Sequence, residues 1–234
     1  IPDTITEVSG SSAEVLSLLS LARGKEITTK EYPEEIDVSD EPVRVGVLVC
    51  HCGTNIAGVI DVEKVTDYAR SLPNVVYAER TLYACSADTQ KRIKEIIKEY
   101  NLTRLVVASC SPRTHEPLFK ETMKEAGLNP YLFEMANIRD QASWVHQKET
   151  EKATKKAMDL VRMKIAKVSL LEPLYNKPLP VIRKALVLGG GISGLKASLN
   201  LASQGFEVYL VEKNHHLGGN SREIHYTLER SNPQ

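Results

Sequence analysis

The sequence lacks an excess of charge of either sign, because 30 lysine and arginine residues are balanced by 30 aspartate and glutamate residues over 234 positions. Basic residues form no block longer than short pairs such as Lys155-Lys156. A nucleic-acid-binding surface usually requires a basic patch or stripe. Nucleic acid is therefore a disfavoured partner.

Long hydrophobic runs are also absent. The longest apolar stretches have the length of strands, and the N-terminus shows no charged segment followed by an apolar one. A membrane-spanning helix needs about 20 apolar residues, and a secretory signal needs the charged-then-apolar pattern. We therefore expect a cytoplasmic protein without a membrane span.

The length and the apolar fraction of 42% allow hydrophobic cores in one large domain or two ordinary ones. The first residue is Ile1, and the last stretch, "HYTLERSNPQ", stops without a closing element. We expect the polypeptide to be a piece of something larger.

Residues 44–140 alternate apolar, strand-like runs with amphipathic, helix-like stretches. Strands separated by helices are typical of βαβ crossovers, in which helices cover both faces of a parallel sheet. Residues 184–234 begin a second unit with the pattern strand, glycine-rich turn, helix, strand. The predicted fold class is α/β in both segments.

The remaining segments are predicted to be connections. Residues 1–43 combine a short helix, expected from about Ser12 with Gly24 past its end, with a polar linker. Residues 141–183 combine a long charged helix, expected over 141–167, with a proline-punctuated linker.

The chain has few cysteines, and all of them lie in the 44–140 segment: Cys50, Cys52, Cys85 and Cys110. A disulfide between Cys50 and Cys52 is disfavoured because one residue between them would strain its geometry. Three of the cysteines, Cys50, Cys85 and Cys110, are expected to end strands. Because a parallel sheet gathers the carboxyl ends of its strands at one edge, where ligands bind, the thiols are predicted to converge.

Two interpretations of the thiols stay open at this point. In a reducing compartment, converging thiolates are better explained as metal ligands than as disulfides, and soft thiolates select zinc or an iron–sulfur cluster. The spacing matches neither a zinc ribbon nor a ferredoxin, and free cysteine is also a common small core residue. The polar residues after Cys110 would either tune a cluster or cap a helix: Ser111, Arg113, Thr114, His115 and Glu116. Trp144 and His146 are expected to pack at a domain interface.

The second unit carries the pattern G-x-G-x-x-G, with Gly189, Gly191 and Gly194, directly after an apolar strand. Ile192 and Ser193 lie inside the turn and open a helix. Such glycines let the backbone approach a pyrophosphate, which the helix N-terminus binds through free N–H groups. We predict a dinucleotide site; the alternative is a purely structural turn.

Glu212 ends the following strand, where a carboxylate binds ribose hydroxyls and repels a 2′-phosphate; the adjacent Lys213 does not reverse this. The later "HHLGG" adds Gly218 and Gly219, a pair typical of FAD-binding flavoproteins of the disulfide-oxidoreductase type. FAD is therefore favoured over NAD. The chain is predicted to be a parallel-sheet α/β domain followed by the first βαβ unit of a Rossmann-type FAD-binding domain.

Over about residues 44–220, the strings "CHCG", "VVASCSPRTHEPLF", "EAGLNPYLFEMANIRDQASWVH" and "ALVLGGGISGLKASLNLASQGFEVYLVEK" resemble the A subunit of heterodisulfide reductase. The resemblance implies a cytoplasmic iron–sulfur flavoprotein of an anaerobic electron-transfer complex. In such a complex FAD is a branch point for electron bifurcation or confurcation. The resemblance also favours one [4Fe–4S] cluster held by Cys50, Cys52, Cys85 and Cys110.

Two departures from the family pattern matter. Relatives often carry cysteine where this chain has Met123 and Ala142, so either those thiols are dispensable or a ligand has been lost. The sequence also stops near the point where the family's ferredoxin domain begins. We expect another polypeptide to supply the remaining FAD domain and the ferredoxin domains, within a higher-order oligomer.

The leading interpretation is an oxidoreductase subunit, or part of one, that passes electrons between FAD and iron–sulfur clusters and is active only within a complex. No residue is predicted to be a general acid, base or nucleophile, because the cofactors carry such chemistry. The rival is a non-catalytic docking or assembly module whose thiols are structural. A free-standing NAD-dependent reductase is a third, disfavoured interpretation.

Overall fold

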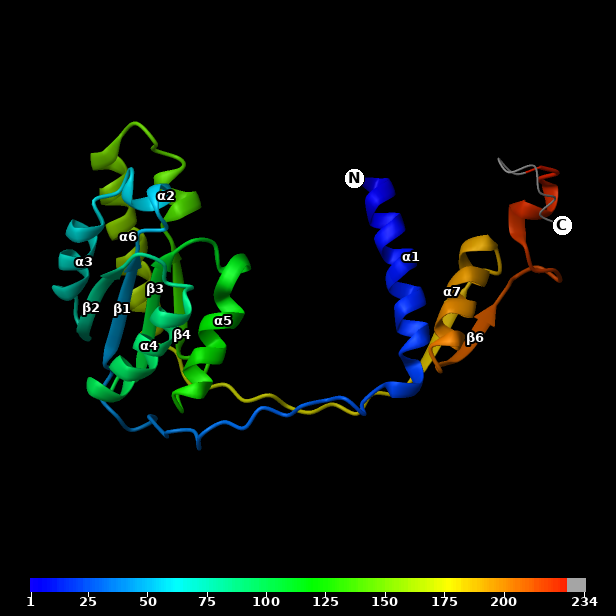
Figure 1. Ribbon diagram of the computed structural model, residues 1–234, viewed down its shortest axis with the longest axis horizontal. Coiled ribbons are helices and arrows are strands. Elements are labelled where there is room, and N and C mark those ends of the chain that lie inside the picture. Colours follow the sequence, from blue (N-terminus) through cyan, green and yellow to red (C-terminus); the bar gives the residue numbers. More distant parts are fainter. Residues whose placement is uncertain (227–234) are drawn as a thin grey trace. The chain divides into compact units, whose positions relative to one another are not determined.

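The computed structural model describes residues 1–226 and divides into two compact units. One unit is Lys30–Asn176, and the other combines Ile1–Thr29 with the chain from Lys177 onward (Figure 1). Residues 227–234 of the predicted 184–234 segment lie outside the described residues. Each unit is considered by itself.

The unit Lys30–Asn176 contains a four-stranded, all-parallel sheet with the order β2-β1-β3-β4. Its strands are β1 Val45–Cys50, β2 Val75–Thr81, β3 Arg104–Ser109 and β4 Phe133–Asn137. Every residue of the central strands β1 and β3 is buried, as expected for parallel strands covered on both faces. The predicted parallel α/β fold is confirmed.

Helices cover both faces of this sheet (Figure 1). Helices α3 Val62–Arg70 and α6 Thr150–Val168 pack against each other on one face. On the other face, α4 Ala87–Glu99 packs against α5 Pro112–Glu125. The hydrophobic core therefore lies in two layers, on either side of the sheet.

Side-chain caps fix where three of these helices begin. Asp61, Ser86 and Ser111 precede α3, α4 and α5, and each accepts a hydrogen bond from a backbone N–H in the first turn. Such caps satisfy N–H groups that have no partner within the helix. Ser111 thus has the capping role that the sequence left as one of two interpretations.

The prediction of a helix over residues 141–167 is wrong about where the helix begins. Arg139–Ser143 form a single π-helical turn, α6 begins only at Thr150, and turns lie between them. The cause is local: the Asn137 side chain accepts a hydrogen bond from the backbone N–H of Asp140 and donates one to its carboxylate. Such bonds favour a turn over a continuing helix.

The second unit contains strands β5 Lys184–Leu188 and β6 Glu207–Val211, which pair in parallel, and the helix α7 Ile192–Ser203 between them. Helix α1 Pro2–Leu18 packs beside α7 in this unit. A short 3-10 helix, Gly219–Glu223, follows β6. The predicted βαβ unit is confirmed.

Helix α1 begins earlier than the expected start near Ser12. It starts at Pro2, and Gly10 lies inside it. Proline is favoured in a first helical turn, and the acidic Asp3 interacts well with the positive end of the helix. These signals outweigh the cost of an internal glycine, about 1 kcal/mol relative to alanine.

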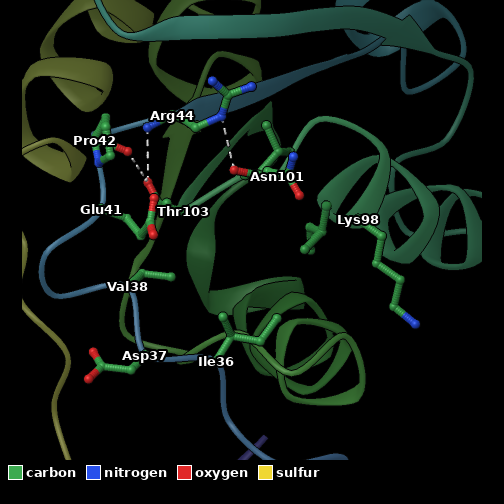
Figure 2. A pocket seen from close by; sticks show the side chains of 11 residues that line it. Ile36, Asp37, Val38, Glu41, Pro42, Arg44, Lys98, Asn101 and Thr103 are labelled. Carbon is green, nitrogen blue, oxygen red and sulfur yellow. Dashed lines mark hydrogen bonds between the residues drawn. The ribbon is translucent and has the colours of Figure 1, made fainter.

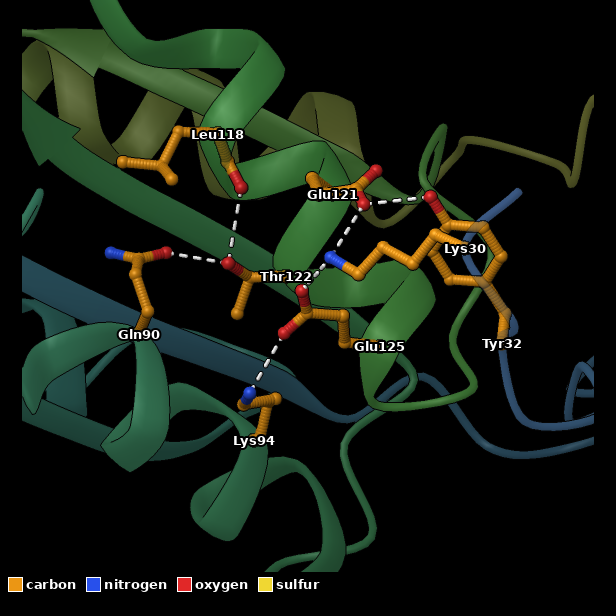
Figure 3. A network of polar contacts seen from close by, with 8 residues as sticks. All are labelled: Lys30, Tyr32, Gln90, Lys94, Leu118, Glu121, Thr122 and Glu125. Atoms are coloured by element: carbon orange, nitrogen blue, oxygen red, sulfur yellow. Dashed lines mark hydrogen bonds and ion pairs between the residues drawn. The ribbon is translucent and has the colours of Figure 1, made fainter. Parts of the chain in front are cut away.

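A polar network holds the segment that enters the Lys30–Asn176 unit against α5 (Figure 3). Lys30 pairs with Glu121 and Glu125, and the Tyr32 hydroxyl donates a 2.7 Å hydrogen bond to Glu121. Glu125 also pairs with Lys94 of α4 at 2.7 Å. The network therefore ties the entering segment to both helices on this face.

Among residues 1–226, every helix is too short or too polar to cross a membrane.

Candidate functional site

The sheet order places a topological switch point at the carboxyl ends of β1 and β3. The chain continues from β1 to β2 on one side and from β3 to β4 on the other, and α/β sheets bind ligands at such a point. Cys50 is the last residue of β1, Cys52 lies two residues beyond it, and Cys110 directly follows β3. Three of the four cysteines therefore lie at this switch point.

Cys85 does not end a strand, contrary to expectation. Strand β2 ends at Thr81, and Cys85 lies exposed in the loop that follows. This loop nevertheless returns to Cys50, whose sulfur accepts a hydrogen bond from the Ala84 N–H at 3.3 Å. The Cys50 thiol also donates to the Leu82 carbonyl oxygen at 3.8 Å. Cys85 is thereby placed at the same edge as the other thiols.

All four thiols are free. Burial raises the pKa of Cys50 to about 11, and the nearby sulfurs of Cys52 and Cys85 contribute in the same direction. Burial also raises the pKa of Cys110, again with a contribution from Cys52. Cys52 therefore lies within electrostatic reach of two other thiols, although the four cysteines are scattered in sequence.

The backbone at Cys52 is unusual. Its φ angle of 49° lies in the left-handed region, and the next residue, Gly53, has a φ of 56°. Few residues other than glycine adopt this conformation, and those that do cluster at functional sites. Backbone hydrogen bonds hold it there, from the Cys52 N–H to Leu82 and from the Asn55 N–H to Cys52, both at 3.1 Å.

The π-helical turn Arg139–Ser143 joins the two loops that carry Cys52 and Cys110. Just before this turn, the Ile138 N–H donates to the Ser109 carbonyl oxygen at 3.0 Å. At its end, the buried Ser143 hydroxyl donates to the carbonyl oxygen of Asn55. Such turns interrupt regular helix geometry and are frequent at functional sites.

Arg139 is a site residue that the sequence analysis missed. Its Nε donates to the Asp140 carboxylate at 2.9 Å, and its guanidinium carbon lies 4.7 Å from the centre of the Trp144 ring. Burial works against its charge, but the neighbouring Asp140 carboxylate outweighs this and raises the pKa of Arg139. Its position two residues after the end of β4 was the available signal, because that strand ends at the same edge.

A buried hydroxyl without a partner lies beside Cys110. The Ser109 Oγ atom is buried and has no hydrogen-bond partner among the described residues. An unpaired buried hydroxyl costs stability. Together with the free thiols, this donor fits a sulfur-ligated group, because hydrogen bonds to sulfur tune iron–sulfur clusters.

The structure also shows where the predicted ligand set and the other residues singled out in this unit lie. Within residues 1–226, no three His, Cys, Asp or Glu side chains are grouped so as to hold a metal ion, and the four-cysteine ligand set stays a prediction. Ala142 is buried in the π-helical turn, and Met123 is buried in α5. Trp144 packs on Arg139 and is about half exposed.

A large cavity of this unit lies at the opposite edge of the sheet (Figure 2). It encloses about 530 Å³ and lies next to the amino ends of β1 and β3. Arg44 lines it, but the Arg44 guanidinium donates to the carbonyl oxygens of Tyr100 and Asn101 at the end of α4. Its charge thus serves the helix C-terminus. This cavity is separate from the thiols.

In the second unit, the predicted glycine turn has the expected tight geometry. Gly189 has a φ of 103°, and a β-carbon at Gly194 would lie only 1.9 Å from the Gly189 carbonyl oxygen. Gly191 caps α7, and Ile192 and Ser193 form its first turn. The turn therefore presents the free N–H groups of a helix N-terminus, as a phosphate site requires.

The second glycine pair folds back onto this turn. The Gly218 N–H donates to the Gly190 carbonyl oxygen at 2.7 Å, and Gly191 and Gly218 form a bridge. A β-carbon at Gly219 would lie 3.2 Å from the Gly191 Cα. Around this contact is a cavity of about 450 Å³, lined by Gly191, Ile192, Gly218, Gly219, Asn220, Ser221 and Ile224. The structure thus brings the two predicted glycine motifs together.

Glu212 lies at the same turn. Its carboxylate accepts hydrogen bonds from the N–H groups of Gly190 at 2.6 Å and Asn214 at 2.9 Å. The N–H groups of Asn214 and Gly190 lower the pKa of Glu212, so this side chain carries its charge at neutral pH. The neighbouring Lys213 is exposed.

Comparisons with known proteins find relatives of this chain that agree with the predicted family and with the Rossmann-type second unit. Residues 187–232 match the family model of an NAD(P)-binding Rossmann-like domain. Over 191 residues the chain is 53% identical to one of the iron–sulfur A subunits of the CoB--CoM heterodisulfide reductase of Methanopyrus kandleri. The chain is a homologue of the heterodisulfide reductase A subunit. The predicted resemblance is confirmed.

Two further relatives show the extent of this homology. The chain is 52% identical over 195 residues to the A subunit of the H(2):CoB-CoM heterodisulfide,ferredoxin reductase of Methanothermobacter marburgensis. It is 49% identical over 191 residues to a protein of Archaeoglobus profundus that is described as like the heterodisulfide reductase A subunit. These matches cover 82–83% of this chain but only 27–29% of each relative. The chain thus spans less than a third of the length of these relatives.

Proposed function

We propose that this chain is an electron-transfer part of a heterodisulfide-reductase-like complex, with one iron–sulfur site and one dinucleotide site. The proposed ligands of a [4Fe–4S] cluster are Cys50, Cys52, Cys85 and Cys110. The proposed binding site for the ADP half of FAD consists of Gly189, Gly191, Ile192, Ser193, Gly194, Glu212, Lys213, Gly218 and Gly219.

The observation that supports this proposal is that free thiols from separate loops lie at one edge of the sheet, where the carboxyl ends of β1 and β3 form the topological switch point. Burial raises the pKa values of Cys50 and Cys110, with a smaller contribution from the Cys52 sulfur, and a buried, unpaired Ser109 hydroxyl lies next to Cys110. Soft thiolate sets are typical ligands of iron–sulfur clusters. The name of the Methanopyrus kandleri relative, which calls it an iron–sulfur protein, supports the same assignment.

Bound cofactors would supply the electron-transfer chemistry, and the chain's residues would hold and tune them. The Ala84 N–H that points at the Cys50 sulfur is a donor of the kind that stabilises a cluster thiolate. The turn at Gly189–Gly194 offers N–H groups to a pyrophosphate, and Glu212 offers a charged acceptor to ribose hydroxyls. The matching family model is described as NAD(P)-binding and does not itself favour FAD. The proposed preference for FAD over NAD therefore rests on the Gly218-Gly219 pair alone.

The partners that we propose are other components of such a complex. They would include a polypeptide region that completes the dinucleotide fold and carries ferredoxin-type clusters. The two-stranded β5-β6 sheet supports this, because a two-stranded sheet is only marginally stable by itself. Its outward residues Leu186, Leu188 and Tyr209 are exposed apolar side chains that a partner could cover.

Anaerobic reconstitution of the chain tests the iron–sulfur site. We expect about four irons per chain and thiolate-to-iron absorption. Cys85→Ser and Cys110→Ser should lower the iron content, whereas the control Thr81→Ser, at the end of β2, should not. Colourless protein that contains zinc would overturn the cluster assignment.

A second candidate function is a docking or assembly module whose thiols are structural. It is favoured by the burial of Cys50 and Cys110, which are 4% and 7% exposed, because buried thiols with raised pKa values are typically inert. In this case Cys85→Ser and Cys110→Ser would leave both the iron content and the activity of the assembled complex unchanged.

A further inference from the structure

The loops at the carboxyl edge of the four-stranded sheet expose large apolar side chains. Between residues 44 and 168, six large hydrophobic side chains are exposed, and four of them belong to these loops: Leu82, Tyr83, Trp144 and Val145. Each of the four is between 48% and 67% exposed. We call these four residues the apolar patch. Single exposed apolar residues are common, but a group of them is typical of a surface that another molecule covers.

Leu82 and Tyr83 lie against the loop that carries Cys52. The Leu82 carbonyl oxygen accepts the Cys52 N–H at 3.1 Å, and a β-carbon at Gly53 would lie 3.3 Å from the Tyr83 hydroxyl oxygen. The Tyr83 carbonyl oxygen also accepts the Ser86 N–H at 3.0 Å, just before helix α4. These contacts hold the first half of the patch beside the left-handed turn at Cys52.

Trp144 and Val145 reach the same loop from the segment after β4. The Ser143 hydroxyl, directly before Trp144, donates to the Asn55 carbonyl oxygen, three residues beyond Cys52 in the chain. The Arg139 guanidinium lies 4.7 Å from the centre of the Trp144 ring and restrains it, while about half of the Trp144 surface stays exposed. The ring is thus a preorganised aromatic anchor, of the kind that dominates the binding energy of protein interfaces.

The unpaired cations at this edge indicate the chemistry of the partner. Arg113 and Lys148 are exposed and have no acidic partner within residues 1–226. Arg113 lies in the first turn of α5, where the positive end of the helix disfavours a cation. A carboxylate from a partner would relieve this repulsion, so the local charges favour an acidic partner.

The acidic residues at this edge are already compensated. Asp140 pairs with Arg139, and Glu149 pairs with Lys152. Acidic residues that lack a basic partner in the described part of the chain lie at helix N-termini, which stabilise negative charge: Asp61, Asp88 and Glu151. Nucleic acid requires a basic stripe, and a membrane surface requires a longer apolar face. An apolar, aromatic centre beside two cations therefore fits a protein better than either.

We propose that the apolar patch, together with Arg113 and Lys148, is a docking surface for an acidic protein component of the complex. This inference rests on the proposed function and deepens it, because it names the surface through which the chain meets a partner beside Cys52 and Cys85. It requires no bound cofactor.

Hydroxyl-radical footprinting tests the surface in the assembled protein. The complex is purified at low salt through an affinity tag on the full chain, and its footprint is compared with that of the same chain after a high-salt wash. Oxidation of Tyr83 and Trp144 should be severalfold slower in the complex. Val76 of β2 and Met163 of α6 are the controls, because both are exposed and lie outside the patch. Slower oxidation of these two without protection of Tyr83 and Trp144 would overturn the inference.

Substitutions test whether the patch contributes binding energy. Trp144→Ser should lower the amount of partner protein retained on the tagged chain roughly tenfold, and Tyr83→Ser should lower it as well. Met163→Ser is the matched control and should retain the wild-type amount. Circular dichroism should be unchanged in all three variants, because the side chains are exposed. Full retention by a folded Trp144→Ser chain would contradict the proposal.

Carbodiimide cross-linking tests the acidic character of the partner, because this reagent joins a lysine amine to a carboxylate in contact with it. We expect a cross-link from Lys148 to an aspartate or glutamate of the partner protein. Lys155 of α6, also exposed and without an acidic partner among the described residues, is the control. Lys148→Glu should weaken retention at low salt, and Lys155→Glu should not. A link from Lys148 to a second copy of this chain, or loss of the partner on treatment with nuclease or detergent, would overturn the inference.

The outcomes separate this inference from the proposed function. A complex that contains iron and FAD but leaves Tyr83 and Trp144 unprotected would overturn the docking surface while the proposed function stands. A complex without iron and FAD in which both residues are protected would refute the proposed function and leave the docking surface. A tagged chain that purifies at low salt without any partner protein would overturn the inference as well.

Discussion

A β-carbon placed on Gly194 would lie 1.9 Å from the carbonyl oxygen of Gly189. Helix α7 therefore approaches the turn that precedes it so closely that a side chain cannot fit between them. Gly189 itself has a φ of 103°, a conformation that residues other than glycine rarely adopt. The shape of the dinucleotide turn thus depends on both glycines.

Gly194→Ala should distort this turn and reduce the FAD content of the assembled complex severalfold. The reason is that the new methyl group must push α7 away from the N–H groups that would face the pyrophosphate. Bound FAD per complex, measured by absorption after gel filtration, checks the prediction. Gly10→Ala is the control, because a β-carbon there meets nothing within 4 Å and should stabilise α1 by about 1 kcal/mol. A Gly194→Ala complex with full FAD content would contradict it.

Glu212→Gln should weaken binding of an unphosphorylated adenine dinucleotide by roughly tenfold. The substitution removes the negative charge of the carboxylate. This carboxylate accepts hydrogen bonds from the Gly190 and Asn214 N–H groups and is proposed to bind ribose hydroxyls. The substitution should also reduce the difference in affinity between NAD and NADP, because the Glu212 charge no longer repels the 2′-phosphate of NADP. Calorimetric titration with both nucleotides measures this. Glu207→Gln, an exposed pair partner of Lys184 in the same unit, should leave both affinities unchanged.

Much of the fold could be predicted from the sequence because the signals were local. The strands β1 and β3 are continuous apolar runs, and Gly189, Gly191 and Gly194 occur in a spacing whose geometry follows from glycine itself. The parallel sheet in turn predicted a common edge for Cys50 and Cys110. These inferences needed no knowledge of side-chain packing.

The parts that could not be predicted depend on contacts between loops. The strand pattern continued through Leu82 and Tyr83 to Cys85, but β2 ends at Thr81, where the chain turns back toward Cys50. The position of the Arg139 side chain likewise depends on tertiary contacts. It is set by the π-helical turn, by Asp140 and by the Trp144 ring, and no periodicity in the sequence reports these contacts.

Glu134→Gln should destabilise the Lys30–Asn176 unit by about 1–2 kcal/mol at pH 7. Burial opposes the ionisation of Glu134, but Lys164, at 2.6 Å, and Lys167 outweigh it, so its pKa in the folded protein lies below the ordinary value of 4.5. The stabilisation is therefore present above about pH 4.5 and is lost as the pH falls through the folded-state pKa.

Urea unfolding followed by Trp144 fluorescence at pH 7 and pH 3 checks this pH dependence, because the sole tryptophan lies in this unit. The difference between wild type and Glu134→Gln should be smaller at pH 3. Glu172→Gln, a change at an exposed carboxylate of the connecting segment, should have no such effect. A difference that stays constant with pH would show that the substitution acts through packing instead.

Asn129→Ala should release both segments that connect the two units. Asn129 is buried, and its amide nitrogen donates to the Glu35 carboxylate at 3.1 and 3.2 Å and to the Leu174 carbonyl oxygen at 3.2 Å. One side chain thus binds the segment that enters the Lys30–Asn176 unit and the segment that leaves it. Its carbonyl oxygen also accepts the Tyr131 N–H at 3.0 Å.

Loss of these part-buried hydrogen bonds should cost about 1–3 kcal/mol. The measurable result is faster limited proteolysis within residues 30–43 and 171–176, since cleavage requires local release of the chain. Asn129→Asp should accelerate cleavage further, because a second carboxylate would face Glu35. Asn176→Ala is the matched control: it removes a single exposed hydrogen bond to the Tyr131 hydroxyl, at 3.0 Å. If both alanine variants were cleaved at the wild-type rate, Asn129 would not be what holds the two segments together.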